Sequence, residues 1–491
     1  MAFFGCVIVS TQRRYHRLCA LEQLLFSFFR RKRMAARSSN SSLKVQGYEH
    51  APMQRNAAPR GSTIAGLRWR IIGLIFLVTC INYIDRSSIG LLVTHFGPDI
   101  GITSRQYGLI GALLLMAYTV SQSVSGRLYD RYGARIGFTV SIVIWSAAAM
   151  AHSAITGFAS FAACSFFLGL GEAGNWPGAA KVIAEWFPQK ERALGMAIFN
   201  GGASMGGVVA PLLVARLLDP LVDWRVSFLI VGALGFVWLV AWLATYRPLS
   251  QHPRVSEQER NYILEGQPAI TQLAAPSLRS LLALRQTWGI LLARFLVDPI
   301  WWLYMLWLPT YLKEVRHFSL KDIGVSAWIP YLAAAIGSLF GGWLSGRIIS
   351  QGLSVNVARK TVTGVAACLM TLGIVAAHAA TAYAALVYIS IVLFGFQMWI
   401  SNVQTLPSDF FSNSAVGSVA GMGGTAAGVS SLIFNLSTAS LVSHFGYGVV
   451  LTIAGVLAPI GAITLFLLVG NIHRLNTPDA RIIAAKHSKG I

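Results

Sequence analysis

The sequence carries few charged residues for its length. Asp, Glu, Lys and Arg make up only 12% of its 491 residues, whereas 55% are hydrophobic and the mean hydropathy is +0.60. A soluble globular protein carries roughly 25% charged residues. Polar side chains are therefore too few to cover a water-soluble body of this size, which disfavours a large soluble helical protein and favours an integral membrane protein.

Cysteines and catalytic motifs are also scarce. None of the five cysteines forms a metal-ligand spacing, and three lie in predicted spans, so we expect no metal and no disulfide framework (Cys6, Cys19, Cys80, Cys164 and Cys368). The chain contains no G-x-S-x-G, Walker loop, H-E-x-x-H or zinc spacing. These absences predict a protein that is not an enzyme, has no cofactor and is not a self-contained ATP-driven pump.

What the sequence does contain is long apolar runs. A membrane-spanning helix needs about 20 mostly apolar residues. Twelve segments meet this need, at 71–94, 107–125, 136–152, 157–177, 194–218, 226–246, 286–312, 323–345, 361–378, 382–404, 415–443 and 447–470. The sequence therefore predicts an all-α membrane protein with twelve transmembrane helices.

The longest polar stretch between spans divides them six and six. An internal repeat agrees with this division, because GRLYDRYGAR at 126–135 follows span 2 and GWLSGR at 342–347 follows span 8, sharing G-x-L-x-x-R. Two related halves with the substrate site between them are a known transporter architecture. We predict two pseudo-symmetric six-helix bundles, and the expected parts are an N-terminal tail (1–68), a first bundle (69–246), a cytoplasmic linker (247–285), a second bundle (286–470) and a C-terminal tail (471–491).

The net charge of +21 has a topological explanation. Residues 1–70 contribute +11 of it, and the loops after even-numbered spans hold 14 Lys and Arg, more than twice the number in the alternate loops. Positively charged loops stay in the cytoplasm and contact anionic lipid. We therefore expect both termini in the cytoplasm, membrane lipid as a partner, and no binding of nucleic acid.

The tail allows two interpretations. Residues 20–29 can form a short interfacial helix anchored by the basic run at 30–33, or translation can start later, at Met34 or Met53. The apolar run at 1–10 precedes its charges, unlike a secretory signal peptide. Residues 35–66 have a composition typical of disorder.

The loop after span 2 is suited to a gate. Its glycines allow helix ends to approach closely, and Asp130 can accept hydrogen bonds from an arginine or a helix N-terminus in the same half. Arg131 and Arg135 complete the candidate gating set. The alternative is a topological signal that only retains the loop inside, but such a signal requires neither the aspartate nor the glycines.

These ten residues resemble the G-x-L-x-D-R-x-G-x-R signature of the major facilitator superfamily. Residues 169–211, GLGEAGNWPGAAKVIAEWFPQKERALGMAIFNGGASMGGVVAP, resemble spans 4 and 5 of the hexuronate transporter group in the anion:cation symporter family, and the segments 81–90, 293–312 and 406–424 agree. The resemblance covers roughly 70–475. It implies the major facilitator fold and import of organic anions, commonly with protons, by a rocker-switch movement of two bundles in the bacterial cytoplasmic (inner) membrane.

Ionisable residues inside spans are costly and usually functional. In span 1, Arg86 can bind a substrate carboxylate through two parallel hydrogen bonds, and Asp85 can carry a proton. The alternative for each is a structural ion pair to another helix. The family resemblance implies the same two roles at these positions.

Span 4 contains Glu172 within G-L-G-E-A-G-N-W-P, where the glycines and Pro177 predict a broken or closely packed helix. We predict that Glu172 exchanges a proton, the alternative being a neutral packing residue, and that Asn175 contacts substrate. Many relatives carry an arginine two helical turns before this glutamate, whereas this chain has Ser165. The site then loses one positive charge, which leaves the exact substrate open.

Span 7 contains Arg294 and Asp298, whose i,i+4 spacing places them on one helix face. They form either a self-neutralised structural pair or a coupling device in which the ligand carboxylate competes for Arg294 and changes the proton affinity of Asp298. Trp301 and Tyr304 follow and can pack on a sugar face. Further candidate substrate contacts, each alone more often an interhelical hydrogen bond, are Tyr83, Tyr118, Gln397, Asn402 and Asn435.

Taken together, the sequence predicts a proton-coupled importer of a small organic anion, with a hexuronate as the first candidate and aldonates and aromatic acids next. The alternative is an exchanger or an efflux pump of the same fold for another acid or a drug. Intramembrane arginines argue against the apolar cavity of a drug pump. A receptor is disfavoured because no signalling domain is visible, and we expect a monomer.

Overall fold

The computed structural model describes residues 64–217, 223–265, 275–319, 326 and 328–475. The expected interfacial helix, the alternative start residues Met34 and Met53, and Cys6 and Cys19 lie outside these described residues, as do most of both expected tails. The first described helix, α2, begins at Leu67, close to the predicted start of the first bundle.

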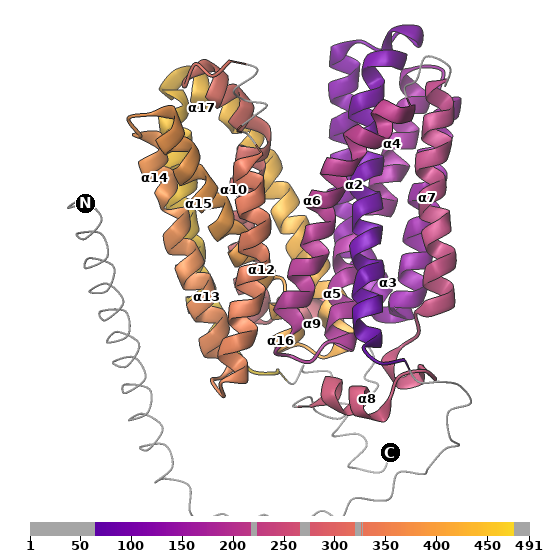
Figure 1. Ribbon diagram of the computed structural model, residues 1–491, viewed down its shortest axis with the longest axis vertical. Coiled ribbons are helices and arrows are strands. Elements are labelled where there is room, and N and C mark those ends of the chain that lie inside the picture. The colour runs from indigo at the N-terminus through magenta and orange to yellow at the C-terminus, as the bar shows by residue number, and fades with distance from the viewer. Residues whose placement is uncertain (1–63, 218–222, 266–274, 320–325, 327, 476–491) are drawn as a thin grey trace, which may run out of the picture. The chain divides into compact units, whose positions relative to one another are not determined.

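Helices account for nearly all of the described chain. The first half comprises α2 (Leu67–Asp99), α3 (Ser104–Ala151), the short helix η1 (His152–Ala154), α4 (Phe158–Glu172), α5 (Asn175–Trp186), α6 (Arg192–Leu217) and α7 (Trp224–Thr245). The linker contributes η2 (Leu249–Gln251), α8 (Glu257–Leu264) and α9 (Leu278–Leu282). The second half comprises α10 (Arg285–Glu314), α12 (Ile329–Ser350), α13 (Val355–Met370), α14 (Leu372–Ala377), α15 (Ala382–Val403), α16 (Leu406–Phe410) and α17 (Asn413–Val469). Figure 1 shows the two halves as two groups of helices.

The helices account for the twelve predicted spans. Among the described residues, nine helices are long and apolar enough to cross a membrane. Two of these, α3 and α17, each contain two spans that meet at Gly133 and Gly446, where φ is 82° and 77°. Only glycine adopts such values without strain, so each glycine forms the turn between two helices. The span made by α4 and α5 completes the twelve, because each of its two pieces is too short to be counted alone.

The predicted break in span 4 is present, but the predicted end at residue 177 is too early. Helix α4 ends at Glu172, and α5 starts at Asn175 and continues to Trp186. The glycines around the break pack closely: a Cβ at Gly171 would lie 2.6 Å from the backbone nitrogen of Trp145. The predicted span ended too early because the charged residues Lys181 and Glu185 interrupt the apolar run. Both are accommodated inside the protein, since Lys181 pairs with Asp130 and Glu185 accepts from Tyr246.

Each half has its own apolar core, and its outer surface is apolar too. Trp145, Trp186 and Trp242 are fully buried in the first half, as is Trp399 in the second. Large side chains such as Val240 and Leu467 are instead about 70% exposed on long helices. An apolar exterior on spanning helices suits contact with lipid chains, where the helix satisfies its own backbone.

Candidate functional site

The intramembrane charges of the first half form one pair. Arg86 on α2 donates from Nε and Nη2 to Oε2 of Glu172, at 3.0 and 2.5 Å. The guanidinium also lies over the ring of Tyr118 at 4.5 Å and of Tyr83 at 5.8 Å. Glu172 is fully buried. The structure therefore brings together four predicted site residues from α2, α3 and α4. Of the two partners predicted for Arg86, a substrate carboxylate or an ion pair with another helix, this conformation shows the ion pair.

Unpaired polar groups surround this pair. Both oxygens of Asp85 and both amide atoms of Asn82 are buried without a hydrogen-bond partner among the described residues. Asn175, at the start of α5, donates to the hydroxyl of Thr79 at 3.2 Å, while its Oδ1 is unpaired. A buried carboxylate without donors is costly in its charged form, and no described side chain compensates Asp85 for that cost.

The second half holds a matching pair. Arg294 on α10 donates from Nε and Nη2 to Oδ2 of Asp298, at 3.1 and 2.7 Å, as their spacing predicted. Arg294 also lines a cavity between the halves, together with Trp176 and Met196 of the first half and Gln404 and Gly423 of the second. Neither arginine is fully buried, since 22% of the Arg86 side chain and 12% of the Arg294 side chain is exposed.

The two aromatic candidates on α10 pack against other side chains of the second half. Trp301 stacks on Phe396 at 5.6 Å between ring centroids and meets the edge of Tyr331. Tyr304 is 1% exposed within the core of the second half, and its ring lines a separate apolar cavity beside Trp307. Neither lines the cavity at Arg294, because the helix turns them toward their own half.

The remaining candidates divide in the same way. Asn402 is fully buried, donates to the carbonyls of Gly341 and Met398, and accepts from Arg359, so its hydrogen bonds hold helices together. Asn435 accepts from the indole of Trp307 at 3.0 Å. The Oε1 atom of Gln397 is buried without a described partner, so Gln397 is the one of these three with an unused acceptor.

Asp130 joins the two halves, and the predicted location of its partners was wrong. Its Oδ1 accepts from Lys181 at 2.9 Å and from the backbone of Gly417 at 3.0 Å, and its Oδ2 accepts from the backbone of Ser418 at 2.6 Å. Lys181 also donates to the carbonyl of Asn413. The helix end is therefore that of α17 in the opposite half, and the cation is a lysine rather than an arginine. Sequence spacing cannot reveal this because 287 residues separate Asp130 from Gly417.

The two neighbouring arginines do not share this role. Arg135 donates to the carbonyls of Leu243 and Tyr246, so it caps the end of α7 within the first half. Arg131 is exposed and lies beside the ring of Tyr132.

A second network between the halves was not predicted. Arg359 donates to Oδ2 of Asp409 at 2.9 Å, Gln189 donates to its Oδ1 at 3.2 Å, and Arg192 donates to the carbonyl of Ser408 at 2.8 Å. Asp409 and Arg359 are 2% and 1% exposed. The sequence offered no signal for it: EWF at 185–187 resembles DFF at 409–411, but Glu185 accepts from Tyr246 and Leu249 beside its own half rather than across the halves.

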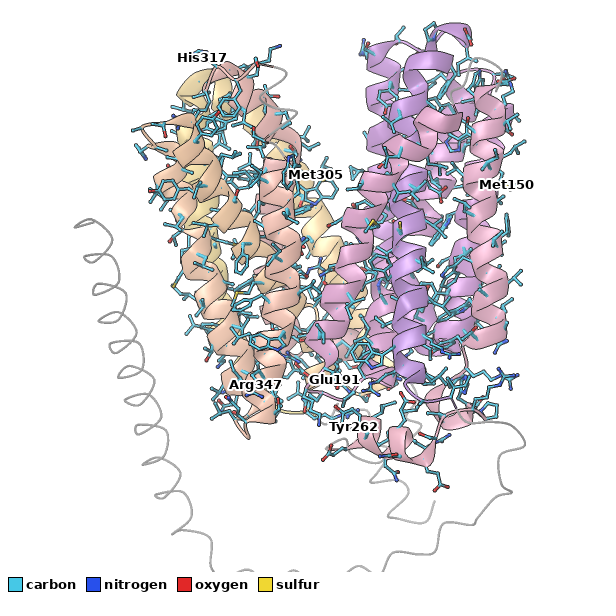
Figure 2. All side chains as sticks on the ribbon, viewed as in Figure 1. Met150, Glu191, Tyr262, Met305, His317 and Arg347 are labelled. Carbon is cyan, nitrogen blue, oxygen red and sulfur yellow. The ribbon has the colours of Figure 1, made fainter. Side chains whose placement is uncertain are left out.

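The linker binds to the same end of the first half. Arg68 donates to Glu191 and to Glu259 at 3.1 Å each, and the hydroxyl of Tyr262 donates to Glu191 at 2.5 Å. Burial, with help from Glu191, raises the pKa of Tyr262 to about 12, so the phenol keeps its proton. Figure 2 shows Glu191, Tyr262 and Arg347 at one end of the helices and His317 at the other. We call the first of these the linker end.

The two copies of the internal repeat pack equivalently near the linker end. A Cβ at Gly126 would meet the carbonyl oxygen of Gly417, and a Cβ at Gly342 would lie 2.7 Å from the carbonyl oxygen of Ala193. Each glycine thus allows a helix of one half to approach the backbone of the other. The position of Asp130 corresponds to Gly346, so only the first copy holds an acid.

This packing gives a prediction for Gly126→Ala. The added methyl group should weaken the contact between the halves by about 1–3 kcal/mol, because neither backbone can yield without strain. A disulfide between Cys residues placed at Ser123 and Thr425, whose hydroxyls are 2.8 Å apart, reports the contact. In an otherwise cysteine-free protein, cross-linking should slow about tenfold. Gly111→Ala on the same helix is the control, since nothing lies near its Cβ; equal rates in both variants would contradict the role of Gly126.

Ser165 forms a hydrogen bond with a histidine at the end of span 3. Its hydroxyl lies 3.3 Å from Nε2 of His152, whose ring stacks on Phe228 at 5.2 Å. Both Ser165 and His152 are fully buried. The position at which many members of the resembled family carry an arginine is therefore a serine that is hydrogen-bonded to a histidine of the same half.

The family model described as Major Facilitator Superfamily matches residues 75–435. The chain is 32% identical over 413 residues to the hexuronate transporter of Escherichia coli (strain K12), covering 83% of this chain and 95% of the relative. It is 34% identical over 312 residues to the galacturonate transporter of Dickeya chrysanthemi, covering 62% and 90%.

Solved structures agree on the fold. The proton:xylose symporter XylE is similar with a TM-score of 0.66 and 15% identity, covering 86% of this chain and 99% of the other. The fucose:proton symporter FucP of E. coli has a TM-score of 0.61 and 13% identity, covering 82% and 98%. The predicted resemblance and the predicted twelve-helix fold are confirmed.

Proposed function

Because this chain belongs to the Major Facilitator Superfamily and is a membrane transporter rather than an enzyme, we propose that it imports a small sugar acid together with protons. A hexuronate is the first candidate substrate, supported by the names of relatives that transport hexuronate and galacturonate. The observation that carries the proposal is that each half holds a partly exposed arginine bound to a carboxylate inside the membrane.

The pairing suggests how protons and substrate are coupled. A proton on Glu172 removes the charge that holds Arg86, so the guanidinium is free to bind a substrate carboxylate. Loss of the proton restores the internal pair and displaces the anion. Asp298 controls Arg294 in the same way, and Asp85 is a reserve proton site without competing donors.

The gate determines which side can exchange ligand. We assign the linker end to the cytoplasm of a bacterial inner membrane, in keeping with the basic loops at that end. The bonds of Asp130 and Asp409 across the halves then hold the cytoplasmic side closed. A low outside pH protonates Glu172 and loads the site, and the higher inside pH releases both ligands.

The test is uptake of labelled galacturonate, gluconate and benzoate into proteoliposomes, with and without an inward proton gradient. We expect galacturonate to accumulate only with the gradient. A transporter that accumulates benzoate and ignores galacturonate would retain the coupling and lose the sugar-acid assignment. Uptake that needs a counter-anion inside and ignores the gradient would identify an exchanger, and gradient-driven export would identify an efflux pump.

A further inference from the structure

The cavity beside Arg294 extends toward the linker end. From the first half it is lined by Trp176 and Ala180, one and two turns beyond Glu172, and by Met196 near the start of α6. From the second half it is lined by Arg294 and by Gln404 at the end of α15. The cavity therefore lies between the charged pairs and the networks of Asp130 and Asp409, on the route that an imported ligand must follow.

Three groups in this region have unused hydrogen-bonding capacity toward the described chain. Arg294 uses Nε and Nη2 for Asp298 and makes no described hydrogen bond from Nη1. The Nε2 amine of Gln404 donates no described hydrogen bond, and the Oδ1 atom of Asn200, a residue only 5% exposed, is unpaired. A buried amide oxygen is rarely left without a partner, so Oδ1 of Asn200 points to a ligand that donates a hydrogen bond. The unused N–H groups of Arg294 and Gln404, which line the cavity, suit a ligand that also accepts.

Asn200 and Gln404 also bond to each other across the halves. Nδ2 of Asn200, on α6, donates to Oε1 of Gln404 at 3.2 Å. When the halves separate at the linker end, this bond must break, because its two residues belong to different halves. Gln404, which lines the cavity, and Asn200 beside it then no longer satisfy each other, and both amides are free to bind a ligand.

We propose that Asn200 and Gln404 are specificity-determining residues that bind the hydroxyl groups of the substrate while the linker end is open. The ligand class is a polyhydroxy carboxylate, whose carboxylate lies on Arg294 and whose hydroxyls pair with the two amides. Trp176, held edge-to-face against Phe199 at 4.7 Å, offers an apolar ring face to the sugar. The inference rests on the proposed transport of a sugar acid, and none of these three residues was predicted from the sequence.

Exchange assays on membrane vesicles of both orientations test it. The competitors are galacturonate and cyclohexanecarboxylate, which has the ring and the carboxylate but no hydroxyls. With the linker end facing the added competitor, Asn200→Leu and Gln404→Met should each weaken inhibition by galacturonate about tenfold and leave cyclohexanecarboxylate within about twofold. With the opposite end facing it, the galacturonate effect should be smaller. Gln351→Leu, at an exposed position after α12, is the control.

Each outcome decides the inference. Equal weakening for both acids, or an equal effect from both sides, would overturn it. Asn200→Ser keeps an acceptor oxygen and should recover part of the galacturonate inhibition, which a folding defect would not allow. If the wild-type protein exchanges no galacturonate at all, the proposed function fails, whereas normal exchange with unaltered variants removes only this inference.

Discussion

Glu172→Gln is expected to abolish accumulation of substrate against its gradient while leaving exchange of labelled for unlabelled substrate intact. Glutamine imitates the protonated acid, so Arg86 stays free to bind the anion, but no proton can leave. One coupled proton at a difference of one pH unit supplies about 1.4 kcal/mol, or about tenfold accumulation. Uptake into proteoliposomes should therefore fall to the level of simple equilibration.

Two measurements make this result specific. Glu257→Gln changes an exposed glutamate in the first turn of α8 and should accumulate substrate like the wild type. Exchange should also lose its pH dependence in Glu172→Gln, since the competing carboxylate has gone. An equal loss of accumulation and exchange would assign Glu172 to binding or folding instead.

Arg294→Ala should weaken carboxylate binding by about 30-fold or more. Truncating one partner of a buried charge pair costs about 2–5 kcal/mol, and Arg294 is the guanidinium that lines the cavity between the halves. The expected loss appears as a higher half-saturating concentration in exchange assays. Arg279→Ala, at an exposed position in α9, should leave that concentration unchanged.

A double variant separates binding from stability. Arg294→Ala leaves Asp298 as a buried carboxylate without its partner, which is destabilising in itself. Arg294→Gln with Asp298→Asn removes both charges and should restore thermal stability without restoring affinity. Recovery of wild-type affinity in this double variant would show that Arg294 only neutralises Asp298.

Residues that are close in sequence were placed well. The i,i+4 pair of Arg294 and Asp298 forms as its spacing indicated, and the helix break beside Glu172 lies among its glycines. Both depend on a few consecutive residues of one helix. The sequence did not predict that Tyr304 points into the core of its own half, because a position on a helix does not show which neighbouring helix packs against it.

Partners from distant helices were placed poorly. The sequence predicted that Arg86 binds either a substrate carboxylate or an ion-pair partner on a helix that it could not identify. In the structure the partner is Glu172, 86 residues away. The sequence assigned Asp130 to its own half, and the structure bonds it to α17. No role was predicted for Asp409, Arg359 or Gln404, yet their hydrogen bonds lie between the halves.

By itself the sequence determined that this chain crosses the membrane twelve times in two related halves. Apolar length and loop charge decide whether a single segment inserts into the bilayer, and both are visible in that segment alone. Only the tertiary structure decided which charges meet, which side is closed and where the cavity lies. Those outcomes depend on the rotation and approach of helices hundreds of residues apart, where close packing at glycines such as Gly126 selects one set of partners.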